Sequence, residues 1–249
     1  MSHHYLSFEN VSYTYPDGTA ALRSISFLIN HGEKVAIIGA NGAGKSTLIM
    51  HTNGLLLPDS GTVNVGNIKI TKQTLPIIRQ SVGLVFQNAD DQLFMPTVYD
   101  DVAFGVINMN LPQSEIDRRV TQALNDTNSY HLKDKASYQL SGGQKRNIAI
   151  ATVLAMEPNI LVMDEPTANL DSKSRRNLIN LIKSFSHTCI IATHDLDLAW
   201  EICPRTIIMA NGSIIADGST RELLTDTNLL NKTELEQPYQ ARYPINGSV

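Results

Sequence analysis

The stretch Gly39-Ala40-Asn41-Gly42-Ala43-Gly44-Lys45-Ser46-Thr47 follows directly on the apolar run Val35-Ala36-Ile37-Ile38. A buried strand that leads into a glycine-rich turn and then a helix brings backbone N–H groups together at the positive end of the helix. Glycines let that backbone come close to a ligand because they have no Cβ. The alternative, a plain glycine turn between a strand and a helix, does not require this complete spacing. The stretch therefore predicts a phosphate-binding loop (P-loop) and a bound nucleotide.

Each polar side chain of the P-loop has an expected contact. Lys45 reaches the β- and γ-phosphates and so also counts as catalytic, the Ser46 hydroxyl ligates Mg²⁺, and Thr47 hydrogen-bonds on the α-phosphate side. The nucleotide-binding residues expected in this segment are Gly39, Asn41, Gly42, Gly44, Lys45, Ser46 and Thr47.

Length and charge narrow the class of protein. The 249 residues are enough for one large α/β core or for a core with an inserted subdomain. The net charge of -4 argues against a broad basic face, so we expect no nucleic-acid partner. The longest uncharged, mostly apolar stretch, 147–156, is well short of the roughly 20 residues of a membrane span, and the N-terminus lacks a secretory pattern. We expect a chain that neither spans a membrane nor is secreted.

Apolar patterns predict two kinds of sheet with helices between them. Short strands in 5–38 indicate an antiparallel edge, and further strands are expected at 62–65 and 82–86. From about 87 to 140 the segments are polar and helix-like, including a helix that begins after Pro112-Gln113-Ser114. Three short, fully apolar strands then follow, which is typical of a parallel sheet covered on both faces. They are 160–163, 189–192 and 206–209.

Two carboxylates follow the first of these apolar strands. Asp164 and Glu165 come directly after 160–163, at the carboxyl end of a buried strand, where parallel sheets bind their ligands. Asp164 is suited to Mg²⁺, directly or through water, and Glu165 is placed to accept a proton from an attacking water. Asp-Glu after an apolar strand is a weak signal alone. The P-loop upstream makes it a strong one.

A third motif, Leu140-Ser141-Gly142-Gly143-Gln144, precedes a helix-prone run over 145–156. Ser141 is suited to cap that helix, and the small glycines leave its first N–H groups open to an anion, which would be a γ-phosphate. In isolation the segment could be an ordinary capped helix. Its position between a P-loop and a strand that ends in Asp-Glu makes it a specific signal for a phosphate-binding segment.

Together these residues resemble the ATP-binding subunit of an ATP-binding-cassette (ABC) transporter, over about residues 5–225. The resemblance implies that Tyr15 stacks on adenine, and that Gln87 touches Mg²⁺ or the lytic water and senses the membrane partner. It also implies that His194 contacts the γ-phosphate, and that Asp171 belongs to a loop that communicates across a dimer. Taken alone, each of these residues has a structural explanation: Tyr15 as an edge-strand aromatic, Gln87 as a surface residue and His194 as a hydrogen-bonded histidine at a strand end. Their order along the chain, together with the other motifs, favours the functional roles.

The resemblance further implies how the residues act together. Two subunits pair head to tail, so that the P-loop of one and Ser141, Gly142, Gly143 and Gln144 of the other close on the same ATP. The expected catalytic residues are Glu165, His194, Gln87 and Lys45. The expected Mg²⁺ ligands are Ser46, Gln87 and Asp164. Tyr15 and Asp171 complete the expected ATP-binding set. A homodimer and a heterodimer with a related subunit are equally compatible with these residues.

The fold class predicted is therefore α/β: a P-loop NTPase core of the ABC ATPase fold, with an N-terminal antiparallel β-subdomain and an inserted α-helical subdomain. The core and the β-subdomain are expected at 1–86 and 155–225, and the helical insertion with the signature motif at 87–154. A short C-terminal tail is expected at 226–249, whose last residues, from 236, dock or stay mobile.

A narrower resemblance, over 87–94 and 97–105, is to the energy-coupling-factor (ECF) ATPases, which drive uptake of cobalt, nickel and vitamins. In that branch the segment lines a groove that grips the membrane protein. The chain departs from the pattern at Ala89, where Pro is usual, and at Asn147, where Arg is common. The expected partners are a transmembrane coupling protein and a membrane substrate-binding protein, and the expected location is the cytoplasmic face of the membrane.

Two other functions compete with an ECF motor. The ATPase of another ABC importer or exporter would share every catalytic residue and differ in 87–105. A non-transport ABC ATPase that acts on nucleic acid or ribosomes is disfavoured by the compact insertion, the single module and the acidic net charge. The transported substrate cannot be read from the chain.

Overall fold

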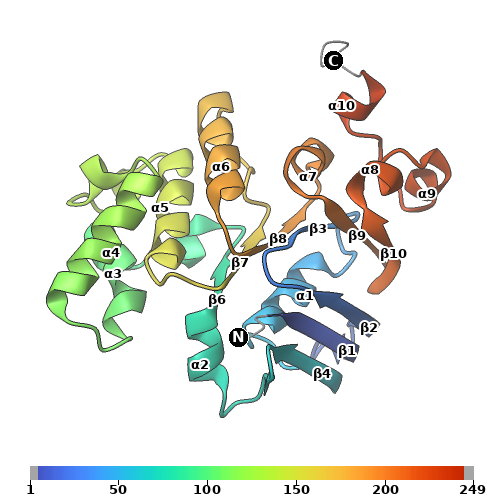
Figure 1. The fold of residues 1–249 in the computed structure, drawn as a ribbon, viewed down its shortest axis with the longest axis horizontal. Coiled ribbons are helices and arrows are strands. Elements are labelled where there is room, and N and C mark those ends of the chain that lie inside the picture. The colour runs from blue at the N-terminus through green and yellow to red at the C-terminus, as the bar shows by residue number, and fades with distance from the viewer. Residues whose placement is uncertain (1–4, 244–249) are drawn as a thin grey trace.

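The computed structural model describes residues 5–243 (Figure 1). Its strands are β1 (Leu6–Thr14), β2 (Ala20–Ile29), β3 (Lys34–Ile38), β4 (Ser60–Val65), β5 (Ile68–Lys69), β6 (Val82–Val85), β7 (Ile160–Asp164), β8 (Thr188–Thr193), β9 (Arg205–Ala210) and β10 (Ser213–Ser219). Its α-helices are α1 (Lys45–Thr52), α2 (Leu75–Ser81), α3 (Val98–Ile107), α4 (Gln113–Asp126), α5 (Gly142–Leu154), α6 (Ser172–Ser184), α7 (Leu196–Ile202), α8 (Thr220–Leu223), α9 (Thr227–Lys232) and α10 (Tyr239–Arg242). Short 3₁₀ turns are η1 (Ala89–Asp91), η2 (Tyr130–Leu132) and η3 (Ser137–Gln139).

The central sheet has the strand order β10-β9-β3-β8-β7-β6. Its strands are parallel except β10, which pairs antiparallel with β9. Successive residues belong to different cores: Ile37 and Ile190 to one buried cluster, Ile38 and Ile191 to another. Both faces are therefore covered, which is why these strands read as continuous apolar runs. The predicted parallel sheet is confirmed, and β10 is an edge strand that the prediction lacked.

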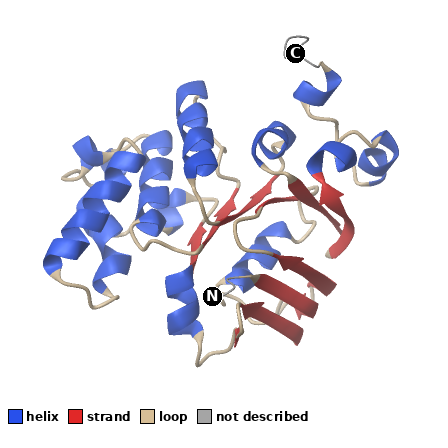
Figure 2. Cartoon of the chain, in the orientation of Figure 1, coloured by secondary structure: helices blue, strands red, loops and turns tan. Residues whose placement is uncertain are grey.

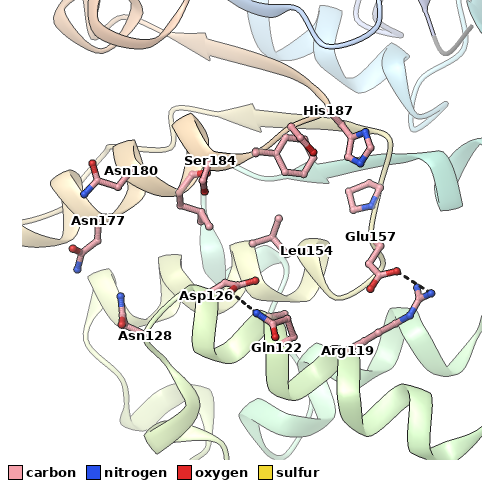
Figure 3. Close-up of a pocket in the computed structure, with 15 residues that line it drawn as sticks. Arg119, Gln122, Asp126, Asn128, Leu154, Glu157, Asn177, Asn180, Ser184 and His187 are labelled. Carbon is pink, nitrogen blue, oxygen red and sulfur yellow. Dashed lines mark hydrogen bonds and ion pairs between the residues drawn. The ribbon is translucent and has the colours of Figure 1, made fainter.

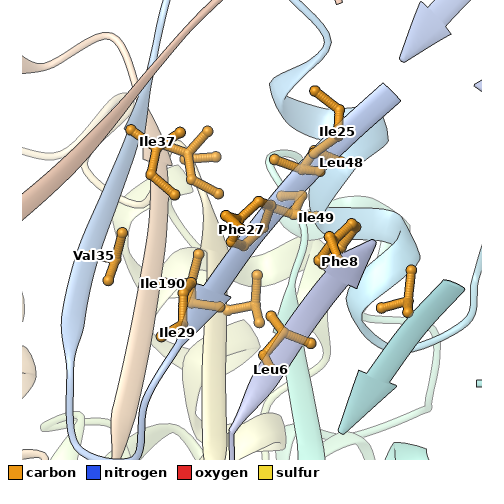
Figure 4. Close-up of a cluster of buried hydrophobic side chains, with 14 of the residues drawn as sticks. Leu6, Phe8, Ile25, Phe27, Ile29, Val35, Ile37, Leu48, Ile49 and Ile190 are labelled. Atoms are coloured by element: carbon orange, nitrogen blue, oxygen red, sulfur yellow. The ribbon is translucent and has the colours of Figure 1, made fainter. Parts of the chain in front are cut away.

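The two faces are covered by different layers (Figure 1). On one face, α1 and the antiparallel sheet β2-β1-β4-β5 enclose a core that includes Phe8 and Phe27, whose rings stack at 4.6 Å (Figure 4). On the other face lie α5, α6 and α7, with Ile179 and Ala199 fully buried. The N-terminal antiparallel subdomain is thus confirmed, and α1 with the P-loop lies between the two sheets.

A helical lobe of α3, α4 and α5 lies beyond β6, at one end of the molecule (Figure 2). Its core is separate from those of the sheets and includes Val102, Val120 and Ile148. The helix predicted after Pro112-Gln113-Ser114 is α4, which begins earlier than expected, at Gln113. Because α5 also packs on the central sheet through Ala149, the lobe is anchored to the core. The exact domain limits stay a prediction.

The C-terminal part has more regular structure than expected. β10 forms a hairpin with β9 across Asn211 and Gly212, which have φ of 50° and 75°. Asn-Gly is the strongest short hairpin signal, so the sequence did carry this information. In the tail, α10 docks because the N–H of Gln240 donates to the Asp197 carboxylate at 3.1 Å. The expectation for 244–249 lies outside the described residues.

Candidate active site

The P-loop joins the end of β3 to α1, and close contacts require glycine at two of its positions. Gly44 precedes α1 in the left-handed region, with φ of 100°. A Cβ at Gly39 would lie 2.3 Å from the backbone oxygen of Met209, and one at Gly44 would lie 2.6 Å from that of Ala21. Any side chain at either position would have to displace neighbouring backbone, so the loop keeps its shape only with glycine there.

Lys45 is buried within the loop, with 7% of its surface exposed. Its ammonium donates hydrogen bonds to the backbone oxygens of Gly39, at 2.7 Å, and Ala40, at 3.1 Å. Burial lowers the pKa of Lys45, and attraction to Glu165 and Asp164 opposes that shift. The ammonium is therefore a partly desolvated cation on neutral partners, and a polyphosphate would offer it stronger, charged ones.

A cavity of about 510 Å³ opens beside the loop. It is lined by Tyr15, Thr19, Ala20, Ala21, Asn41, Gly42, Gly44, Lys45, Ser46, Thr47, Gln87 and Glu165. The Tyr15 hydroxyl lies 3.0 Å from Oγ1 of Thr47, so the expected adenine platform already touches the P-loop helix. An adjoining cavity of about 440 Å³ shares Asn41 and is lined also by Gly39 and His194. The structure thus gathers the P-loop, Tyr15, Gln87, Glu165 and His194 around two adjoining cavities.

Asp164 ends β7 beneath the P-loop, with 4% of its surface exposed. Burial raises the pKa of its carboxyl group, and a hydrogen bond with the Ser46 side chain opposes that shift. Its Oδ1 is buried and has no hydrogen-bond partner among the described residues. A buried carboxylate oxygen without a partner, beside a hydroxyl oxygen, matches the hard oxygen ligands that Mg²⁺ prefers. These two residues therefore fit the expected metal.

Glu165 follows at the same strand edge in a left-handed backbone conformation, with φ of 44°. Such strain costs of order 1–3 kcal/mol and persists only where the surroundings hold it. Here the carboxylate accepts hydrogen bonds from Oγ1 of Thr193, at 2.9 Å, and from the backbone N–H of His194, at 3.0 Å. Nδ1 of His194 lies 2.8 Å from the same carboxylate. The predicted base and the predicted γ-phosphate contact are therefore in direct contact with each other.

The signature residues lie elsewhere. Ser141 caps α5 by accepting from the N–H of Gln144, and the Gln144 side chain accepts from the N–H of Ser141, which is a complete capping box. Ser141 and Gly142 are exposed, and neither lines the P-loop cavity. Asp171 caps α6 through the N–H groups of 173 and 174. The predicted cap is confirmed, but the structure does not bring these ATP-binding candidates to the P-loop of their own chain.

A protein-family model described as "ABC transporter" matches residues 22–168. The matched region runs from β2 through the P-loop and the signature to just beyond Glu165. It therefore includes the P-loop, the signature and both carboxylates, and covers more than half of the chain. The chain belongs to the ABC transporter family.

Similar proteins place this ABC chain more closely. It is 53% identical over 238 residues to a putative ABC transporter ATP-binding protein, GSU1281, of Geobacter sulfurreducens, covering 96% of both chains. It is 42% identical to the energy-coupling factor transporter ATP-binding protein EcfA of Methanothermobacter thermautotrophicus, covering 95% of this chain and 78% of the relative. The ECF-type resemblance is confirmed, and the family identifies an ATPase.

Solved structures agree with the ABC ATPase fold. The structure of cbiO1 from Clostridium perfringens, part of the ABC transporter complex cbiONQ, matches with a TM-score of 0.80 and 43% identity, over 92% of this chain and 94% of that one. The ATP-binding cassette MJ0796, a dimer bound to ADP and Pi, matches with a TM-score of 0.80 and 30% identity, over 86% and 98%. Within residues 5–243, no helix combines the length and the apolar character that crossing a membrane requires.

The segment 87–105 of this ABC chain lines a groove of about 540 Å³ between α2, β6, α3 and α5. Phe94 and Phe104 stand at the groove with 64% and 45% of their surfaces exposed, and their rings meet edge to face at 5.1 Å. Exposed aromatic pairs at a hollow are typical of protein-binding sites. The groove shares no lining residue with the P-loop cavity.

Sequence reasoning missed two residues that support the site. Thr193 is fully buried and holds Glu165, and its place at the end of an apolar strand, just before His194, was an available signal. Arg146 is 4% exposed and donates to the backbone oxygens of Phe86 and Gln87. No pattern in the sequence distinguishes this buried arginine from an exposed one on the same helix.

A further cavity, of about 820 Å³, lies away from the site, between α4, the end of α5 and α6 (Figure 3). It is next to Pro158 and His187, which precede β7 and β8, so it adjoins the opposite ends of the strands that carry Glu165 and His194. An ion pair between Arg119 and Glu157 lies along its wall. The cavity shares no lining residue with the P-loop cavity.

Proposed function

We propose that this chain is the ATP-hydrolysing motor subunit of an ECF-type importer that takes up a micronutrient such as cobalt, nickel or a vitamin. One observation carries the proposal: Lys45, Asp164, Glu165 and His194, from three separate strand ends, meet at the P-loop. The likeness to ECF ATP-binding proteins and to cbiO1 supports the branch.

The proposed mechanism assigns a task to each side chain. The P-loop N–H groups and Lys45 hold the β- and γ-phosphates, and Tyr15 supports the adenine. Ser46, Asp164 and Gln87 are the residues that would hold Mg²⁺, which supplies positive charge against the phosphates. Asp164 and Ser46 fit because the Asp164 carboxyl group keeps one buried oxygen without a partner among the described residues and hydrogen-bonds to the Ser46 side chain.

Glu165 is the proposed general base. Hydrogen bonds from Thr193 and from the backbone of His194 fix the orientation of its carboxylate, and therefore also that of its remaining lone pairs. From there it takes a proton from the attacking water, a task worth roughly 10²–10⁴-fold in rate. The His194 ring, 67% exposed, is free to turn from Glu165 to the γ-phosphate when ATP arrives.

Hydrolysis in this proposal needs a second subunit, either a second copy or a related ATPase. The exposed Ser141 and Gly142 have polar groups that are used only in the α5 cap, and they suit the ATP held by a partner's P-loop. The dimeric state of the MJ0796 relative supports this arrangement. ATP binding closes the head-to-tail dimer and hydrolysis reopens it.

The proposed membrane partners are a transmembrane coupling protein, seated in the groove at Phe94 and Phe104, and a membrane substrate-binding protein that selects the cargo. The chain then acts at the cytoplasmic face, as a peripheral subunit without a nucleic-acid partner. ATP-driven opening and closing of the dimer moves the two grooves and so the coupling protein.

The test is to purify the chain from its native membranes in mild detergent with ATP and to identify the co-purifying proteins by mass spectrometry. We expect one small transmembrane coupling protein together with a substrate-binding membrane protein. Conventional permease subunits alone would assign the chain to another ABC importer or exporter. Ribosomal or DNA-repair proteins in their place would exclude transport.

A further inference from the structure

The segment that carries Gln87 is held by the first turns of α5. Arg146, in the second turn, donates a hydrogen bond to the backbone oxygen of Phe86 at 2.6 Å, and a second to that of Gln87. The guanidinium can make both bonds at once because its donors form a fixed planar fork. Two consecutive carbonyl groups are thereby fixed by one side chain from a helix about sixty residues away in sequence.

Two further contacts join the same partners. The Gln92 side chain accepts from the N–H of Phe86, at 3.1 Å, and donates to the backbone oxygen of Ala149 and to Oγ1 of Thr152, both at 2.7 Å. Lys145 pairs with Asp90 at 2.5 Å. Loop 86–92 and the helix that begins with the signature are therefore linked at three places. Of these links, only Arg146 contacts Gln87 itself.

The charge of Arg146 ties this link to the catalytic carboxylates. Among the residues that the structure describes, no carboxylate forms an ion pair with it, although only 4% of its surface is exposed. Burial lowers the pKa of the guanidinium, and attraction to Asp164 and Glu165 opposes that shift. A buried cation without a paired anion is costly. The two carbonyl groups of Phe86 and Gln87 accept its hydrogen bonds, and attraction to the carboxylates at the end of β7 further favours the charged form.

We propose that Arg146 is a positioning residue for Gln87: it holds the Gln87 backbone so that the side chain faces the P-loop cavity, and it makes loop 86–92 move with the signature turn. The inference rests on the proposed function, in which Gln87 acts at the metal or the lytic water. Since the signature meets a partner's ATP in that proposal, Arg146 links the partner's site to the chain's own site.

The test is a double-mutant cycle of R146Q and Q87A in the full-length chain, with kcat and the KM for ATP measured at saturating Mg²⁺. R146Q is expected to lower kcat about tenfold, within the range of coupling between residues in contact, and to leave the KM for ATP within about twofold. The double variant is expected to be no slower than Q87A alone. R146K, which keeps the cation, is expected to recover part of the loss.

R119Q is the matched control. Arg119 is likewise shielded from solvent, with 15% of its side chain exposed, but unlike Arg146 it forms ion pairs, with Glu115 and with Glu157 (Figure 3), away from the phosphates. R119Q is expected to lower the melting temperature without a selective loss of kcat. Should R146Q not fold, the cycle is measured with R146K, which keeps the charge but lacks the planar fork of donors that the guanidinium has.

The outcomes separate the two proposals. Losses in kcat that multiply in the double variant, or an R146Q variant that loses stability but keeps kcat, would overturn the role of Arg146 alone. A wild-type chain without ATPase activity, tested with its co-purified partners, would overturn the proposed function instead. A rise in the KM for ATP equal to the fall in kcat would place Arg146 in general packing and also overturn the inference.

Discussion

The P-loop region and the signature turn both carry residues expected to bind ATP, yet they are built in opposite ways. At the P-loop, Lys45, Asp164 and Glu165 are each less than 8% exposed and are held by contacts within the chain. At the signature, Ser141 and Gly142 are exposed, and their contacts serve only to begin α5. The P-loop region is thus held in place by contacts within the chain, whereas the signature turn leaves its residues exposed and available to a partner.

The contrast extends to what the glycines do. An added Cβ at Gly39 would collide with the backbone of Met209, whereas one at Gly142 would meet nothing within 4 Å. The P-loop glycine is thus explained by the packing of this chain. Nothing in the chain explains the signature glycine, which the proposed function attributes to a partner's nucleotide. Substitutions in the two regions should therefore fail in different ways.

The largest effect is expected from E165Q, which probes the preorganised region. Glutamine keeps the size of the side chain and can still accept from Thr193, but it cannot take a proton from water. We expect kcat to fall by about 10²–10⁴-fold while ATP binding persists, measured by phosphate release and by nucleotide titration. Normal turnover by E165Q would show that the base is a different residue. The control, E157Q, changes an exposed ion pair outside the site.

The next effect is expected from G39A. Its new Cβ, 2.3 Å from the Met209 oxygen, forces the P-loop and β9 apart. Overpacking of this kind costs about 1–3 kcal/mol, so denaturant unfolding should show lower stability and titration should show weaker ATP binding. G218A is the matched control, because its Cβ would have ordinary contacts at 3.9 Å. If G39A bound ATP as tightly as the wild type, the P-loop would be more adaptable than its packing indicates.

A smaller effect, and the sharpest test of the contrast, is expected from G142A. The chain itself has room for the methyl group at the first position of α5, so stability and ATP binding by one chain should not fall. Hydrolysis should fall about tenfold if a partner's phosphate approaches this glycine closely, which is a loss of about 1.4 kcal/mol. Unchanged hydrolysis would contradict the proposed role of the signature turn, and a lower melting temperature would contradict its structural independence.

The same contrast explains what the sequence could predict. Asp164 and Glu165 lie at the carboxyl end of one apolar strand, and the P-loop with Lys45 and Ser46 begins at the carboxyl end of another. Parallel strands bring these ends to one edge of the sheet, so local patterns sufficed to predict that the four residues meet. Where the signature residues lie relative to ATP could not follow from one chain. These residues are exposed on the surface of the chain, so their position relative to ATP depends on a second subunit. Only the family resemblance suggested that arrangement.

Other features depend on tertiary contacts that leave no local trace. Arg146 is buried because two carbonyl groups of a distant loop receive it, and nothing in the periodicity of α5 marks it. The helix α10 has four residues and is fixed by Asp197, so propensity could not predict it. β10 differs, because the pair Asn211-Gly212 is a local signal for the hairpin that β10 forms with β9, and the strand was therefore predictable from the sequence.

The smallest expected effect is on the pH dependence of stability, and it again distinguishes the P-loop region from the signature turn. His51, at the end of α1, is fully buried, its Nδ1 lies 2.8 Å from the Thr47 backbone oxygen, and its Nε2 has no partner among the described residues. Burial lowers its pKa below the ordinary 6.5, so the unfolded chain binds the proton more readily than the folded one. This contribution to stability is complete above about pH 6.5 and is lost as the pH falls below it, by at most about 1.4 kcal/mol per pH unit.

Denaturant unfolding between pH 7.5 and 5.5 should therefore show a steeper loss of stability for the wild type than for H51Q, which cannot take up that proton. The matched control is H131Q, on the helical lobe, where the histidine is exposed and the slope should stay that of the wild type. Equal slopes for the wild type and H51Q would mean that His51 does not titrate on unfolding. A flatter slope for H51Q alone would trace the acid sensitivity to the helix under the P-loop, because the signature turn has no buried histidine to protonate.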